Sequence, residues 1–152
     1  MTDKIKAIVK SITVKHIIDN DADLSYLGEF SSHEGKYPVE HNGDNSYPYF
    51  NAENVENTAQ ANENYNRMMQ FVNGYVYSIG IKAIAEIHIP IGNNSYIIQH
   101  IHSGGLWGIE SDSDKEYIEA IELEQVVELR DCLKVLCCGN IDSAPIEIKE
   151  MI

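Results

Sequence analysis

The segment Gly104–Asp114, with the sequence GGLWGIESDSD, decides how this chain is organised. It contains the only tryptophan, Trp107, and it connects the clearest pair of predicted strands to the clearest predicted helix. The two consecutive glycines allow a turn or bulge that residues with a side chain rarely adopt. Leu106, Trp107 and Ile109 are expected to anchor the end of a sheet. The segment therefore predicts a structural joint, followed by an acidic surface.

The residues before the joint predict an antiparallel hairpin. Between Ile79 and Ile91 one parity is apolar, and the other carries polar residues such as Lys82, Glu86 and His88. Alternation of this length is typical of a half-buried antiparallel strand, here predicted over residues 75–91. Gly92-Asn93-Asn94 predicts the turn, and residues 95–102 predict the return strand. The pattern leaves the register open, and a slip of one residue would move the return-strand histidines to the opposite face.

The residues after the joint predict a long helix, from about Ser113 to Cys138. Ser113 with Glu116 matches a capping box, and Gly139 is the expected stop. The apolar stripe consists of Ile118, Ile121, Val126, Leu129, Cys132, Leu133 and Leu136. Glu122 falls inside this stripe. We expect either that the first two turns project beyond the sheet or that a basic partner meets Glu122, because an unpaired buried carboxylate costs several kcal/mol.

The rest of the chain completes an α+β prediction. Residues 4–18 indicate a strand whose apolar parity changes near Lys10, which predicts a β-bulge. Residues 25–30 form a short extended piece, and residues 56–72 a first helix. The tail predicts an edge strand around Ile146 and Ile148. The fold class is thus a small antiparallel sheet of three to four strands packed by two helices, in a single domain over residues 1–152 with a long polar loop at about 31–55.

Composition limits the partners. The net charge is −13, and two acidic blocks, residues 19–73 and 103–138, flank a neutral hairpin. Such a field repels nucleic acid and membrane surfaces and attracts basic proteins, although solubility alone also explains it. No apolar run is long enough for a membrane span. The three cysteines lie late in the chain without a CxxC motif, which indicates reduced thiols in a cytoplasm.

The acidic helix is the main candidate binding surface. Its eight carboxylates cover nineteen residue steps, or about 28 Å, which is roughly one per 3.6 Å, and one DNA strand carries a charge per about 3.4 Å. This spacing permits nucleic-acid mimicry, and a solvated helix face is the simpler alternative. The candidate partner-binding residues are Asp112, Asp114, Glu116, Glu119, Glu122, Glu124, Glu128 and Asp131, together with Asp19, Asp21 and Asp23 in an acidic turn.

Two other kinds of function remain open. His88, His100 and His102 lie on paired strands and are candidate ligands for a divalent metal, either in a binding module or in a metal-dependent enzyme. The acidic turn has calcium-loop spacing but lacks the required glycine and glutamate. No Walker loop, GxGxxG, HExxH or GxSxG motif occurs, so the main prediction is a non-enzymatic protein without a cofactor, and the metal-dependent enzyme stays an alternative. The third alternative is a homodimer that forms through an exposed sheet edge.

Three strings carry a family resemblance. DADLSYLGEF, YNRMMQFVNGYVYSIGIKAIAEI and SGGLWGIESDSDKEYIEAIE together resemble a family of small uncharacterised proteins of phages, plasmids and other mobile elements. The resemblance covers most of the chain outside residues 31–55 and the tail, and Lys82 stands where the family often has arginine. It transfers no catalytic residue. It implies an accessory protein acting in the host cytoplasm, and such proteins often inhibit host defence complexes of the CRISPR or restriction type.

Overall fold

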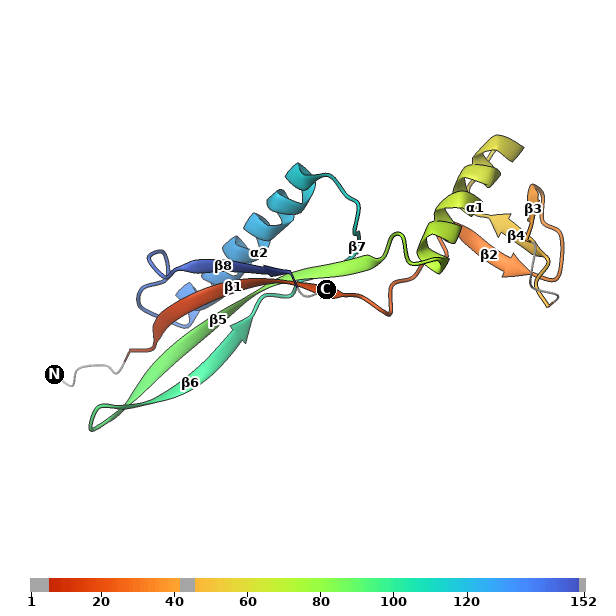
Figure 1. The fold of residues 1–152 in the computed structure, drawn as a ribbon. Helices are drawn as coiled ribbons and strands as arrows, with labels where there is room; N and C mark the ends of the chain where they lie inside the picture. Colours follow the sequence, from red (N-terminus) through yellow and green to blue (C-terminus); the bar gives the residue numbers. More distant parts are fainter. Residues whose placement is uncertain (1–5, 42–45, 151–152) are drawn as a thin grey trace. The chain divides into compact units, whose positions relative to one another are not determined.

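The chain forms two compact units. The computed structural model describes residues 6–41 and 46–150. One unit, here called the sheet unit, contains the residues up to Asn20 and those from Ser78 onward (Figure 1). The inserted unit contains Asp21–Tyr77, between the two parts of the first. The sequence predicts one domain with a polar loop at about 31–55, whereas the structure divides the chain and places two strands in that range.

The sheet unit confirms the α+β class and corrects the strand number. Its sheet has five strands instead of three to four. Their order is β6-β5-β1-β8, and β7 pairs with the other end of β5. All pairs are antiparallel except β1–β8, which is parallel. The elements are β1 (Ile8–Ile18), β5 (Ser78–Gly92), β6 (Ser95–His102), β7 (Leu106–Glu110), α2 (Lys115–Val135) and β8 (Ile146–Glu150).

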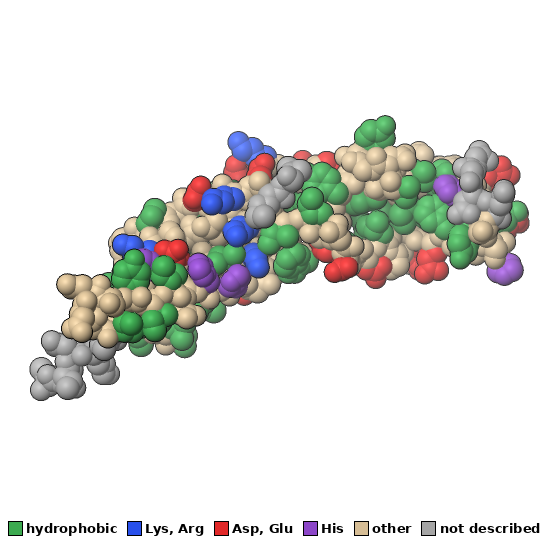
Figure 2. Space-filling model, turned by 60° about the horizontal axis from the view of Figure 1, so that its bottom comes forward, with side chains coloured by type: hydrophobic (Ala, Val, Ile, Leu, Met, Phe, Trp, Pro, Cys, Tyr) green, Lys and Arg blue, Asp and Glu red, His purple; other side chains and the backbone are tan. Residues whose placement is uncertain are grey.

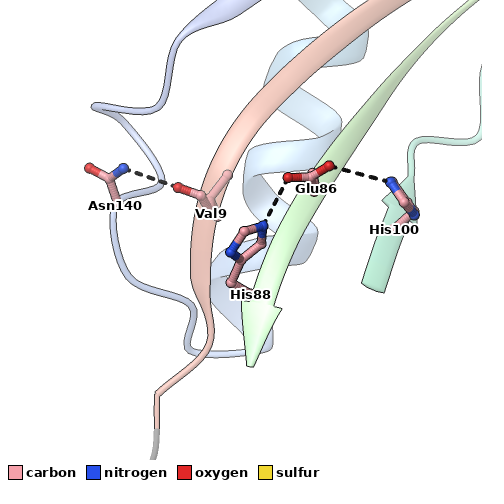
Figure 3. Close-up of polar contacts among 5 residues, drawn as sticks. All are labelled: Val9, Glu86, His88, His100 and Asn140. Carbon is pink, nitrogen blue, oxygen red and sulfur yellow. Dashed lines mark hydrogen bonds and ion pairs between the residues drawn. The ribbon is translucent and has the colours of Figure 1, made fainter. Parts of the chain in front are cut away.

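The pairing of β1 with β5 lies at the centre of this sheet. It runs to Ile18 opposite Ile79, where the inserted unit leaves and re-enters the sheet unit. The register shifts between Val9 and Ser11, which confirms the predicted bulge. The segment that follows α2 holds this bulge, because the Asn140 amide donates a 3.0 Å hydrogen bond to the Val9 carbonyl (Figure 3).

One face of the sheet packs against α2. Directly opposite residues in a sheet share a face, so the buried Ile12, Val14 and Ile81 lie on the same side. The helix contributes Ile121, Val126, Leu129 and Leu133 to this core. Burial of each such side chain contributes about 1.5–3 kcal/mol, so this face holds most of the unit's apolar stabilisation.

The ends of α2 differ from the prediction. The helix begins at Lys115 with Asp114 as its N-cap. Ser113 therefore lies one residue too early for a capping box, and its hydroxyl donates to the Glu110 carbonyl. The helix ends at Val135, because Cys137 adopts a left-handed φ of 57° and the Cys138 N–H bonds to Leu133, as in a Schellman motif.

The cysteines also differ in burial from the prediction. Cys132 was expected in the apolar stripe, but it is exposed, as is the stripe's last member, Leu136. Leu136 follows Leu133, the last buried residue of α2, so the buried side of the helix ends before it. Cys138 is buried, and burial raises the pKa of its thiol, which disfavours the reactive thiolate.

The inserted unit packs one helix on a small antiparallel sheet of order β2-β4-β3. Its core surrounds Phe50, which is fully buried and contacts the rings of Phe30 and Tyr65 at centroid distances of 5.3 and 5.6 Å. Asn51 fixes the connection before β3, because its side chain accepts from the Gly35 N–H and donates to the His33 carbonyl. The elements are β2 (Gly28–Ser31), β3 (Pro38–Glu40), β4 (Tyr49–Ala52) and α1 (Thr58–Val72).

The predicted joint is a bend between β6 and β7, both of which pair with β5. Ile109 is buried as expected, whereas Leu106 and Trp107 are 40% and 47% exposed. The Trp107 ring lies against Gly80 of β5, and a Cβ atom on Gly80 would overlap the ring. The tryptophan is therefore placed by a glycine on the neighbouring strand and not by the core.

We predict that Gly80→Ala displaces the indole and destabilises the protein by about 1–3 kcal/mol, because a methyl group must enter occupied space. Denaturant unfolding followed by tryptophan fluorescence measures both effects, since Trp107 is the only tryptophan. In a Trp107→Ala background, followed by circular dichroism, the same substitution should cost much less. An equal cost in both backgrounds would show that the ring is not the obstacle.

Candidate functional site

Five of the predicted carboxylates lie on exposed positions of α2: Glu116, Glu119, Glu124, Glu128 and Asp131. Two of them have local contacts. Glu128 accepts a 3.0 Å hydrogen bond from the Gly104 N–H, and Glu119 lies 3.7 Å from the exposed Lys115 ammonium. In the described part of the chain, the other three make neither an ion pair nor a side-chain hydrogen bond. The charges of Glu124 and Asp131 thus make no such contact within the described residues, and Glu116 lies in the first turn of α2, where a negative charge is favourable.

The structure corrects the predicted line of eight charges. Asp112 and Asp114 precede the helix, and Glu122 is buried. The five exposed helical carboxylates span fifteen residue steps, or about 22 Å, and at about 100° per residue they spread over half of the circumference. Their mean spacing of about 5.6 Å along the axis is wider than the charge spacing of a DNA strand. The exposed carboxylates of α2 therefore form a broad band around the helix and not a single line along it.

The acidic turn has structural roles of its own. Asp19, in the sheet unit, accepts a 3.0 Å hydrogen bond from the Gly108 N–H. Asp23, in the inserted unit, accepts from the Ser25 N–H at 2.9 Å, and this bond lowers the pKa of the Asp23 carboxyl. Asp21 also belongs to the inserted unit. The three turn carboxylates thus belong to two different units, and Asp19 and Asp23 each accept a hydrogen bond from a backbone N–H.

Of the two expectations for Glu122, the structure shows the second, a basic partner. Its Oε2 atom lies 2.9 Å from Nε2 of His16, on β1. Both residues are 8% exposed, so the contact lies between the helix and the covered face of the sheet. A carboxylate that is buried without a partner is strongly destabilising, so this contact explains how the apolar stripe tolerates an acid.

A second polar contact joins α2 to the bend, and sequence reasoning missed it. The buried Gln125 side-chain oxygen accepts from the Ser103 hydroxyl at 2.7 Å and from the Gly105 N–H at 2.9 Å. The Ser103 hydroxyl in turn accepts from the Ala83 N–H of β5. The glutamine is placed opposite the glycine bend because it satisfies donors that the bend leaves without strand partners.

The opposite face of the sheet carries a row of lysines. Lys15 lies directly opposite Lys82 on one side and Lys149 on the other. Like charges directly opposite one another are destabilising, at Cβ separations of about 4.5–5.5 Å. Burial and the nearby charges of Lys82, His100 and Lys15 lower the pKa of His102, which shares this face. Figure 2 shows lysine, histidine and hydrophobic side chains gathered on one side of the sheet unit.

The predicted metal ligands lie on this open face but do not form a metal site. Glu86 lies between two of them, with carboxylate oxygens 2.9 Å from His88 Nε2 and 3.9 Å from His100 Nε2 (Figure 3). The His88 ring stacks on Tyr96 at 4.3 Å. Within residues 6–41 and 46–150, no three histidine, cysteine or carboxylate side chains are grouped so as to hold a metal ion. His102 lies opposite Ile84, one row further along.

Comparisons of the chain with protein-family models, with curated proteins and with solved structures gave no match. Neither helix in the described residues has the length and apolar character needed to cross a membrane.

We predict that His16→Leu destabilises the protein by about 3–5 kcal/mol, because it leaves the Glu122 carboxylate buried without a partner. The double variant His16→Leu/Glu122→Leu should recover most of this loss, since it removes both polar groups together. Urea unfolding of the two variants beside the wild type measures the difference. If the double variant is the less stable of the two, the contact does not neutralise Glu122.

Proposed function

We propose that this protein is a non-enzymatic accessory protein of a mobile element that inhibits a host defence complex of the CRISPR or restriction type. In this proposal the acidic face of α2 occupies a basic surface that normally binds nucleic acid, and the inhibitor acts in the host cytoplasm. The observation that carries the proposal is the set of exposed α2 carboxylates that make no ion pair or side-chain hydrogen bond in the described residues, above all Glu124 and Asp131.

Charge and rigidity support this proposal. The net charge of −13 attracts basic surfaces and speeds association with them. The carboxylates stand on a helix that is fixed to the sheet by its apolar core, by Gln125 and by Glu122. A rigid array loses little conformational entropy on binding, unlike an acidic loop. The motif resemblance supports a mobile-element origin, and inhibition of host defence follows from it by analogy.

The test compares two variants with the same change in charge. The first neutralises α2 through Glu116→Gln, Glu119→Gln, Glu124→Gln and Asp131→Asn, and it keeps Glu128 because that side chain holds the Gly104 N–H. The matched control neutralises four exposed carboxylates of the inserted unit through Glu29→Gln, Glu53→Gln, Glu56→Gln and Glu63→Gln.

Each protein is immobilised and used to capture partners from a host lysate, and the amount captured is measured at low and high salt. We expect the α2 variant to capture at least about tenfold less partner than the wild type, and the control to capture as much as the wild type does. Capture by the wild type should fall as the salt concentration rises. Duplex DNA added to the lysate should displace the captured protein, because both occupy the same basic surface. The proposal is overturned if the α2 variant captures the same partner as well as the wild type does.

A further inference from the structure

The outer edge of β8 has an arrangement that fits a second copy of itself. β8 is the last strand in the sheet order β6-β5-β1-β8 of the described residues. All five of its residues are exposed, and Ile146 and Ile148 are 46% and 54% exposed. An edge strand presents a row of N–H and C=O groups that other strands can pair with, and apolar residues on such an edge favour pairing.

The ladder with β1 determines which peptide groups point outward. The Ile12 N–H bonds to the Pro145 carbonyl, in a parallel register that sets Ile12 opposite Ile146. In a parallel ladder alternate residues bond to the neighbour, so residues 145, 147 and 149 point their peptide groups at β1. Residues 146, 148 and 150 then direct theirs away from the sheet.

We propose that β8 pairs antiparallel with β8 of a second copy, about a two-fold axis at Ile148. This register sets the outward peptide groups of Ile148 opposite each other and those of Ile146 opposite Glu150 of the other copy. It forms about six hydrogen bonds between the chains. The two sheets then join into one, across an isologous interface.

Charge selects this register over its neighbours. Glu147 and Lys149 lie on the open face, and in the proposed register each faces the opposite charge on the other copy. A shift of the axis by one residue sets Glu147 against Glu147, or Lys149 against Lys149, and such like pairs are destabilising. Within the chain Lys149 already lies opposite Lys15, and the Lys149 Nζ atom is 4.0 Å from Oε2 of Glu147. A carboxylate from the second copy would therefore offset the charge at the end of the lysine row.

The covered face of the sheet adds apolar contact. A groove of about 340 Å³ lies between α2 and β8, with Val14, Val126, Ile146 and Ile148 in its apolar lining and Arg130 and Glu119 among its polar residues. Pairing sets the two Ile148 side chains side by side on its floor, which shields apolar surface that the monomer exposes. The interface is smaller than the roughly 1,200–2,000 Å² of a standard complex, so the dimer is expected to depend on concentration.

Sedimentation velocity of the full chain, at concentrations up to about 1 mM, tests the pairing. The wild type should shift from monomer to dimer as its concentration rises. Lys149→Glu and Glu147→Lys should each weaken dimerisation at least about tenfold, because each sets like charges opposite one another twice. The control Lys36→Glu has the same change in charge as Lys149→Glu but lies in the inserted unit, so it should dimerise as the wild type does. Circular dichroism checks that every variant is folded.

The exchanged variant Glu147→Lys/Lys149→Glu should dimerise again but should not form mixed dimers with the wild type. The absence of mixed dimers is specific to the proposed register, since the exchanged variant keeps the net charge of the wild type and a general effect of charge would let the two proteins mix. A wild type that stays monomeric throughout overturns the proposal. So does a Lys149→Glu variant that dimerises as tightly as the wild type, or an exchanged variant that remains monomeric.

Discussion

The structure depends on the antiparallel pairing of β1 with β5. β5 also pairs with β6 and β7, and β1 with β8, so every strand of the five-stranded sheet bonds to one of these two. The end of the pairing fixes the two points between which the inserted unit lies, because the Asp19 N–H bonds to the Ser78 carbonyl at 2.8 Å. An insertion between these two strands is tolerated because the strands are adjacent and paired, so the ends of the inserted unit are already held together.

The sheet separates two surfaces of different charge. The covered face carries α2 with its outward carboxylates, whereas the open face carries the row Lys149–Lys15–Lys82 beside His100 and His102. The net charge of −13 is a sum over the whole chain and does not describe this division. The open face also carries Glu86 and Glu147, so a partner with a basic surface is attracted more strongly to the face that carries α2.

Sequence patterns identified the long elements and missed the features that depend on distant residues. The alternation in β5 is long enough to predict its buried face, and the change of parity in β1 predicted the bulge. In the inserted unit the sequence predicts the extended piece at 25–30 and the helix at 56–72, but it predicts a loop at about 31–55. The strands there have three or four residues, too few for a periodic signal, and the core is built on scattered aromatic rings such as Phe50 and Tyr65.

The candidate site was predicted only in part for a related reason. The acids of α2 are visible in the sequence, as is the unusual position of Glu122 inside the apolar stripe. That the partner is His16, some hundred residues earlier, depends on which strand lies beneath the helix. The lysine row required the register of three strands at once, and no pattern within one strand specifies it.

The central claim is that the β1–β5 pairing holds the sheet unit together without the inserted unit. Hydrogen exchange on a chain in which Asn20 is joined to Ser78 through an Asn-Gly turn tests this claim most directly, because such a turn suits two adjacent antiparallel strands. We predict that the amides of β1 and the middle of β5 remain the most slowly exchanging in the shortened protein, as in the full chain. Rapid exchange throughout β1 and β5 would contradict the claim, because it would show that the sheet needs the inserted unit to form.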